Sequence, residues 1–168
     1  MILVCLRNIQ YAVKAENQTL IEILLRYGAD PNKQENDEIG LNTPMHMAAQ
    51  RNMIQVIDKF IAAGGDPTIR NKFGFTCLHI ACREGYLDLV NLLKGRGVDE
   101  DIRDEYGNNA SYWAHQNGFT HITAVLSPPL KRTKEEYYEH IKQVWEAHGF
   151  KPGGKKKKGK KGGGKKKK

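Results

Sequence analysis

The sequence predicts an all-helical solenoid of about four helix-turn-helix repeats with hairpin loops. One further helix and a disordered Lys/Gly tail are expected after it. Two observations predict the solenoid: a seven-residue block beginning at Thr43 returns at Thr76, and a turn block around Gly28, Gly64 and Gly97 recurs in phase with it. Such a period is typical of repeat proteins, in which each helix pair buries its apolar face only against its neighbours.

The first block reads T-P-M-H-M-A-A at 43–49 and T-C-L-H-I-A-C at 76–82, so the period is 76 − 43 = 33. A third copy at 109–115 keeps only the central Ala and the general shape. The turn block reads G-A-D-P-N at 28–32 and G-G-D-P-T at 64–68. These two glycines are separated by 64 − 28 = 36, so three residues are inserted between Lys33 and Asn42.

Each helix of the repeat has a recognisable start or end. Thr43 and Thr76 suit N-caps, since their hydroxyls can accept hydrogen bonds from the first-turn amides. Pro44 follows at the first helical position, where its missing amide proton costs nothing. Apolar residues at helical spacing predict the second helices over 54–61 and 87–93. The first helices are expected to end at residues that tolerate a left-handed backbone and that recur with the same period: Asn52, Gly85 and Gly118.

The chain resembles the ankyrin repeat family over roughly residues 4–126. T-P-M-H and T-C-L-H match the family's T-P-L-H, and G-A-D-P-N and G-G-D-P-T match its G-A-D-x-N. The repeat at the start lacks the T-P-L-H box and the one at the end is degenerate, as expected of end repeats with one face in water. The resemblance implies a repeat domain over 1–126 and a non-enzymatic adaptor that binds a protein partner.

Two histidines and two cysteines could suggest a chemical site. His46 and His79 each stand three residues after a cap Thr, where a polar side chain can reach back to the helix start. Cys77 and Cys82 are five residues apart, unlike the C-x2–4-C spacing of zinc sites, and both fall at core positions. We therefore expect structural histidines, buried cysteines, no metal and no cofactor. The sequence holds no nucleophile–base pair, phosphate loop or HExxH motif, which argues against an enzyme.

The resemblance implies a partner surface on the loop tips, called fingers in this family, and on the exposed edge of the first helices. Phe73 and Tyr106 occupy equivalent places in successive repeats, so both finger tips carry an aromatic ring. Aromatic residues dominate binding hot spots, but these rings could equally pack on neighbouring fingers. Ile39 also matches, within the inserted stretch 33–41. The carried-over positions are Asn42, Gln50, Arg51, Lys72, Phe73, Phe75, Arg83, Glu84, Glu105, Tyr106, Asn108, Gln116 and Asn117.

The resemblance also implies a modification. The Asn of the family's G-A-D-x-N turn is often a substrate of an asparagine hydroxylase. Asn32 alone matches it here, because Thr68 and Asp101 occupy the equivalent places. The alternative is a plain turn residue.

The chain changes character after the repeats. Pro128 and Pro129 predict a linker over 127–133, because proline cannot continue a helix. A T-x-x-E capping box at 133–136 then predicts a helix over 134–149 with one apolar face. This helix either caps the last repeat or docks on a partner. Its apolar face carries Tyr137, Ile141, Val144, Trp145 and His148.

The C-terminal segment 151–168 contains 11 Lys, 6 Gly and one Pro, which leaves 1–150 with a net charge of 16 − 19 = −3. A segment of this composition cannot bury apolar surface, so 150–168 should be disordered. It could be a tether for nucleic acid, acidic lipid or acidic protein tails such as those of tubulin, a nuclear import signal, or only solubilising. Without aromatic residues it should not read nucleic-acid sequence. The polyanion-binding lysines would be Lys155, Lys156, Lys157, Lys158, Lys160, Lys161, Lys165, Lys166, Lys167 and Lys168.

These features leave two functions open: an adaptor that binds through its repeats, or a nuclear, nucleic-acid- or chromatin-associated protein that binds through its tail. An odd count of three Cys without a C-x-x-C pair points to a reducing compartment, in the cytoplasm and/or nucleus. No apolar run approaches the ~18 residues of a membrane span. The apolar start, residues 1–6, lacks the basic leader of a signal peptide. We expect a monomer.

Overall fold

The computed structural model describes residues 9–35, 40–128 and 139. The chain divides into two compact units, Met1–Arg132 and Thr133–Lys168, and the helices described below belong to the first. Of the predicted helix 134–149 only Glu139 is described, and both Ile39 and the tail 150–168 with its polyanion-binding lysines lie outside the described residues. Of the predicted linker 127–133, the structure describes Ser127 and Pro128.

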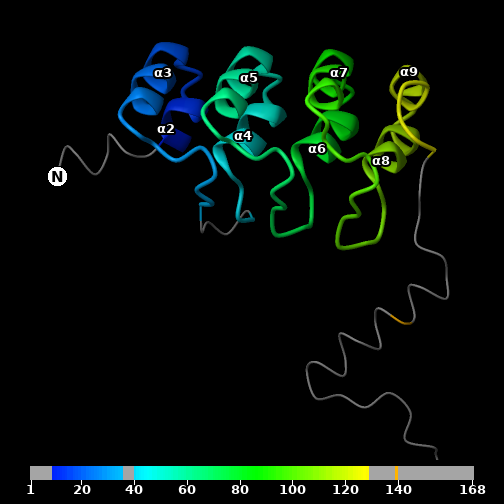
Figure 1. Cartoon of the computed structure of the whole chain (residues 1–168). Helices are drawn as coiled ribbons and strands as arrows, with labels where there is room; N and C mark the ends of the chain where they lie inside the picture. The colour runs from blue at the N-terminus through cyan, green and yellow to red at the C-terminus, as the bar shows by residue number, and fades with distance from the viewer. Residues whose placement is uncertain (1–8, 36–39, 129–138, 140–168) are drawn as a thin grey trace, which may run out of the picture. The chain divides into compact units, whose positions relative to one another are not determined.

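Within the described residues, the chain forms helices and no strand, which confirms the predicted helical solenoid. Figure 1 shows the helices standing in neighbouring pairs, with the loops between pairs projecting to one side. The first helices of the pairs are α2 (Ile9–Lys14), α4 (Pro44–Gln50), α6 (Cys77–Glu84) and α8 (Ala110–Gln116). The second helices are α3 (Gln18–Arg26), α5 (Ile54–Ala62), α7 (Leu87–Gly95) and α9 (Thr120–Thr123).

The core runs through the whole stack. Met45, Ile57, Phe60, Leu78 and Leu89 are fully buried, and they come from both helices of two successive pairs. Each first helix contacts the first helices beside it, and each second helix contacts its counterparts. A single pair of such short helices could not bury these side chains, so every repeat depends on its neighbours for its stability.

The predicted helix caps are confirmed. Thr43 and Thr76 are the N-caps of α4 and α6, and each forms a capping box with the histidine three residues later. The backbone is left-handed at Asn52, Gly85 and Gly118, with φ of 54°, 86° and 77°. These three positions end the first helices with the predicted period.

His46 links two repeats. The Thr43 amide and hydroxyl lie 3.1 and 2.7 Å from His46 Nδ1, and His46 Nε2 lies 2.8 Å from the Phe75 carbonyl oxygen of the next repeat. An amide can only donate, so Nδ1 accepts and Nε2 carries the proton that it donates to Phe75. His79 repeats the arrangement with longer distances, 3.3 Å from the Thr76 amide and 3.4 Å to the Asn108 carbonyl.

At the ends of the stack, amide side chains provide the corresponding links. Gln10 takes the place of His46 in the first repeat, is buried, and donates from Nε2 to the Lys33 carbonyl at 2.8 Å. In the last described repeat, Asn109 caps α8 and donates from Nδ2 to the Pro128 carbonyl at 3.1 Å. A side-chain donor therefore ties each first helix to the chain that follows it, even where the histidine is missing.

One polar side chain shapes each finger. Asn71 Oδ1 accepts from the amides of Phe73 and Phe75 at 2.9 and 3.0 Å. Asp104, at the equivalent place in the next repeat, accepts from the amides of Tyr106 and Asn108 at 2.8 and 2.9 Å. The two fingers therefore have the same local conformation, with an aromatic side chain at the same point.

Adjacent fingers also bond to each other through their backbones. The Lys72 amide donates to the Gly40 carbonyl at 2.8 Å, and the Glu105 amide donates to the Phe73 carbonyl at 3.1 Å. The two backbones come close together at Gly74, where an added Cβ would lie 2.6 Å from the Glu105 nitrogen. Gly74 also has a φ of +75°, so both the conformation and the space favour glycine.

Comparing Gly74→Ala with Gly97→Ala will measure the contact between fingers. Gly97 has a nearly identical φ of +76°, but no described atom lies within 4 Å of its added Cβ. Both substitutions should lose about 1–2 kcal/mol for the left-handed conformation, and Gly74→Ala should lose about 1–3 kcal/mol more from overpacking. Urea unfolding will give the two free energies. If both variants lose the same free energy of unfolding, the contact between fingers does not contribute to stability.

His46→Ala should destabilise the stack by about 2–4 kcal/mol, since it removes a cap and leaves the buried Phe75 carbonyl without its donor. His79→Ala should cost less, because its contacts are longer. The exposed His115 is the control, and His115→Ala should stay within about 0.5 kcal/mol of the unchanged protein. A His46→Ala effect no larger than this control would contradict the link.

Candidate functional site

The structure places the predicted partner residues in three groups. Gln50 and Arg83 are half-buried. Three side chains are buried: Asn42, Phe75 and Asn108. These three side chains offer little surface to a partner. The exposed residues are Arg51, Lys72, Phe73, Glu84, Glu105, Tyr106, Gln116 and Asn117.

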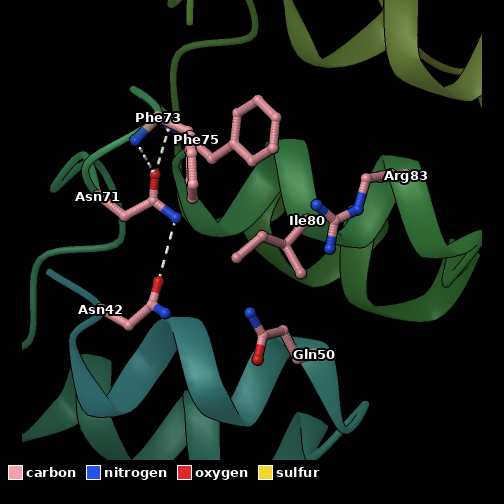
Figure 2. A pocket seen from close by; sticks show the side chains of 7 residues that line it. All are labelled: Asn42, Gln50, Asn71, Phe73, Phe75, Ile80 and Arg83. Atoms are coloured by element: carbon pink, nitrogen blue, oxygen red, sulfur yellow. Dashed lines mark hydrogen bonds between the residues drawn. The ribbon is translucent and has the colours of Figure 1, made fainter. Parts of the chain in front are cut away.

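A pocket of about 210 Å³ lies where a finger meets the first helices. Figure 2 shows that three parts of the chain line this pocket: the two ends of α4, the finger, and one side of α6. Five predicted partner residues line it, together with two that sequence reasoning missed, Asn71 and Ile80. The full lining is Asn42, Gln50, Asn71, Phe73, Phe75, Ile80 and Arg83.

Asn71 is the most informative of the missed residues. Its Oδ1 holds the finger, and its Nδ2 donates to Asn42 Oδ1 of the preceding repeat at 3.0 Å, as Figure 2 shows. This bond gives the buried Asn42 side chain a hydrogen-bond partner in the pocket wall. A short polar residue stands two positions before each aromatic tip: Asn71 before Phe73 and Asp104 before Tyr106. This recurrence in the sequence could have identified Asn71 and Asp104 as the residues that hold the fingers.

Arg83 supplies the positive charge of the pocket. Its guanidinium lies 5.6 Å from the centroid of the Phe75 ring, a cation–π distance, and 2.8 Å from Glu84 Oε1. The Arg83 backbone carbonyl accepts from Asn117 Nδ2 at 2.7 Å. The guanidinium is thus held on an aromatic ring and keeps access to solvent.

The two finger tips keep much of their aromatic surface in water. Phe73 is 44% exposed and Tyr106 is 57% exposed. One edge of the Phe73 ring lies over Gly40 of the preceding finger, where an added Cβ would stand 3.3 Å from it. Phe73 therefore packs on a neighbouring finger with one edge and presents the rest of its ring.

Asn32 connects two turns. Its Nδ2 donates to the Gly64 carbonyl at 3.1 Å, and its Oδ1 accepts from the Asp66 amide at 2.8 Å. The structure thus gives the family's turn Asn a role between repeats that sequence reasoning did not predict. Hydroxylation of Asn32 stays a prediction.

Two cysteines, Cys77 and Cys82, and the two bridging histidines, His46 and His79, are buried in the first helices. Burial, followed by the nearby Glu100, raises the pKa of Cys82 to about 12, and burial also raises the pKa of Cys77. Both are free thiols and are protonated at neutral pH. Among residues 9–35 and 40–128, no group of three or more His, Cys, Asp or Glu side chains could hold a metal ion.

Burial also sets the protonation of the two bridging histidines. It lowers the pKa of His79 to about 4 and lowers the pKa of His46, although the carbonyls they face favour the proton. Neutral imidazoles fit the hydrogen bonds, because Nδ1 must accept while Nε2 donates. Both histidines are therefore neutral at neutral pH and serve as hydrogen-bonding links between repeats.

No helix in the described part of the chain is both long and apolar enough to cross a membrane.

The stack should lose stability as the pH falls from about 6.5 to about 4, the window set by the ordinary and folded pKa values of His79. The unfolded chain binds more protons there, so each histidine contributes a slope of up to about 1.4 kcal/mol per pH unit. Urea unfolding at several pH values will measure it.

The double variant His46→Gln, His79→Gln is the control for this pH dependence. Gln10 shows that glutamine can make the equivalent link, and its amide does not titrate. The double variant should unfold with a flatter pH profile above pH 4. A profile as steep as that of the unchanged protein would assign the acid sensitivity to other groups.

Comparison with known proteins agrees with this architecture. The family model for ankyrin repeats in three copies matches residues 9–104 and 45–132, more than half of the chain. An ankyrin repeat protein of Fowlpox virus (strain NVSL) is 31% identical over 67 residues, which are 40% of this chain and 15% of the viral protein. That small share of the relative supports the repeat alone. The paired helices, the capping boxes and the matched residues together show that the chain belongs to the ankyrin repeat family.

Proposed function

We propose that this protein is a non-enzymatic adaptor that binds a protein partner through its finger tips and the pocket beside them. Ankyrin repeats are generally protein–protein interaction modules. The observation that carries the proposal is the exposure of Phe73 and Tyr106 at equivalent points of two bonded fingers. Phe73 also lines the pocket of about 210 Å³. Aromatic and Arg side chains held in place by neighbours are the usual anchors of protein interfaces.

The contact surface would run from Arg51 and Gln50, across the pocket, to the second finger. The surface carries charges of both signs: Lys72 and Arg83 are positive, and Glu84 and Glu105 are negative. Such a mixture favours a partner recognised by shape and apolar contact with a few ion pairs. A monomer in the cytoplasm and/or nucleus fits this role, and both remain predictions.

The double variant Phe73→Ala, Tyr106→Ala should weaken partner binding by over ~2 kcal/mol, about 30-fold, the lower bound of a hot spot. Far-ultraviolet helicity should not change, since neither tip belongs to the core. Quantitative affinity purification from cell extract, followed by titration of the recovered partner, will measure the loss.

Tyr27→Ala is the matched control for the finger variant. Tyr27 is more exposed than either tip, at 86%, but lies at the end of α3, away from the fingers. It should keep full affinity. If both variants bind alike, the contact surface is not on the finger tips.

The polybasic tail favours a second activity, electrostatic tethering to a polyanion. The tail, 151–168, holds 11 lysines and no acidic residue, while the chain before it carries a net charge of −3. The tail would bind acidic protein tails, nucleic acid or acidic lipid without sequence preference. If this were the main activity, the protein would be the nuclear, nucleic-acid- or chromatin-associated protein of the alternative.

Binding to duplex DNA should be weak and steeply salt-dependent, with log K falling by about 4 to 8 per unit of log salt. A rise from about 50 to about 200 mM salt should then cost on the order of 10² to 10⁴ in affinity. Deleting residues 151–168 should abolish this binding and leave the protein partner bound. Polyanion binding retained by residues 1–150 would place it on the repeats.

A further inference from the structure

Two Ser/Thr-Pro dipeptides occur in the chain, and the structure gives them opposite settings. Thr43-Pro44 begins α4, where Thr43 is 1% exposed and occupied by the capping box with His46. Ser127-Pro128 lies after the short α9, and Ser127 is half-buried at the end of the described repeats. Only the second hydroxyl is near the surface.

One carboxylate holds Ser127 in place. Glu100 Oε2 accepts from the Ser127 amide at 2.7 Å and from the Ser127 hydroxyl at 3.0 Å. Glu100 Oε1 pairs with Lys94 Nζ at 2.9 Å, and Lys94 also donates to the Val125 carbonyl. We call Lys94, Glu100 and Ser127 the clasp, because they join the end of the last described repeat to the turn before it.

The chain around Ser127 suits an extended peptide. Pro128 and Pro129 have no amide hydrogen, so they cannot continue a helix, and a residue before proline favours an extended backbone. Lys131 and Arg132 add positive charge just downstream. The helix before it, α9, has only four residues, and such a short element with few buried contacts opens at low cost.

We propose that Ser127 is a phosphorylation site for a proline-directed protein kinase, and that phosphorylation opens the clasp. In the reaction, Ser127 Oγ attacks the γ-phosphorus of ATP and forms the new O–P bond. The P–O bond to ADP breaks, and the hydroxyl proton passes to the catalytic base of the kinase.

The geometry makes the clasp sensitive to this modification. The Ser127 hydroxyl donates its proton to Glu100, and the phosphoryl group replaces that proton. A phosphate of about −1.5 to −2 charge would then stand beside the carboxylate that held the hydroxyl. Lys94 is the cation of the clasp, and it cannot neutralise both anions at once. The attraction between Ser127 and Glu100 becomes repulsion. The segment around Leu126, which packs on the core, is then no longer held by the hydrogen bonds to Glu100.

The test uses the full chain with ATP and a purified mitogen-activated protein kinase, which is proline-directed. Peptide mapping by mass spectrometry should find phosphate on Ser127 and none on Thr43, and Ser127→Ala should remove the signal. Hydrogen–deuterium exchange in residues 120–128 should accelerate about tenfold on phosphorylation, as expected for a local opening.

Glu100→Gln is the matched variant, because it keeps an oxygen acceptor for Ser127 and removes the negative charge. Phosphorylation should accelerate exchange clearly less in this variant than in the unchanged chain. A synthetic peptide of residues 122–133 controls for kinase preference. Ser127 is refuted as a phosphorylation site if the kinase modifies neither the full chain nor the peptide, or if it modifies the peptide but not the full chain. The clasp mechanism is refuted if phosphorylation leaves exchange unchanged, or accelerates it equally in Glu100→Gln.

Discussion

The hydrogen bond from His46 Nε2 to the Phe75 carbonyl joins a helix of one repeat to the finger of the next, 29 residues further along the chain. This bond and the one that Nδ1 accepts from the Thr43 amide form together only when the imidazole is neutral with its proton on Nε2. One side chain thus caps its own helix and positions the following finger. Since no helix pair buries its apolar face alone, each repeat depends on its neighbours, and such links add to the interface between them.

The proposed contact surface depends on the same links. The Phe75 carbonyl accepts from His46, and the Phe75 amide donates to Asn71 Oδ1, so both ends of the residue are fixed. Its buried ring then carries the guanidinium of Arg83 and lines the pocket. The tip residue Phe73 is fixed by Asn71 as well, and stays 44% exposed. A surface built this way loses little conformational freedom when a partner binds, which favours affinity.

The period of the repeat was enough to predict the helix pairs, the Thr caps and the left-handed helix ends, because these features depend on local sequence. The period did not reveal which backbone carbonyl of the next repeat each linking side chain bonds. The carbonyl that His46 meets lies in another repeat, and Gln10 was not identified as its counterpart because the first repeat lacks the T-P-L-H box. Burial of Asn42 and Asn108 was also missed, since it arises from fingers packing side by side. The positions taken from the family resemblance include five residues that line the pocket, but the resemblance does not separate exposed residues from buried ones.

Nitrogen-15 NMR of the His46 imidazole in the full chain tests the central claim most directly, because the two neutral tautomers and the cation have distinct ring-nitrogen shifts. The account predicts, at neutral pH, a single neutral form with a proton on Nε2 that exchanges slowly with water. It predicts the same tautomer for His79, with faster exchange, since its Nε2 lies 3.4 Å from the Asn108 carbonyl. A proton on Nδ1, or a charged imidazole at His46, would contradict the proposed link between repeats.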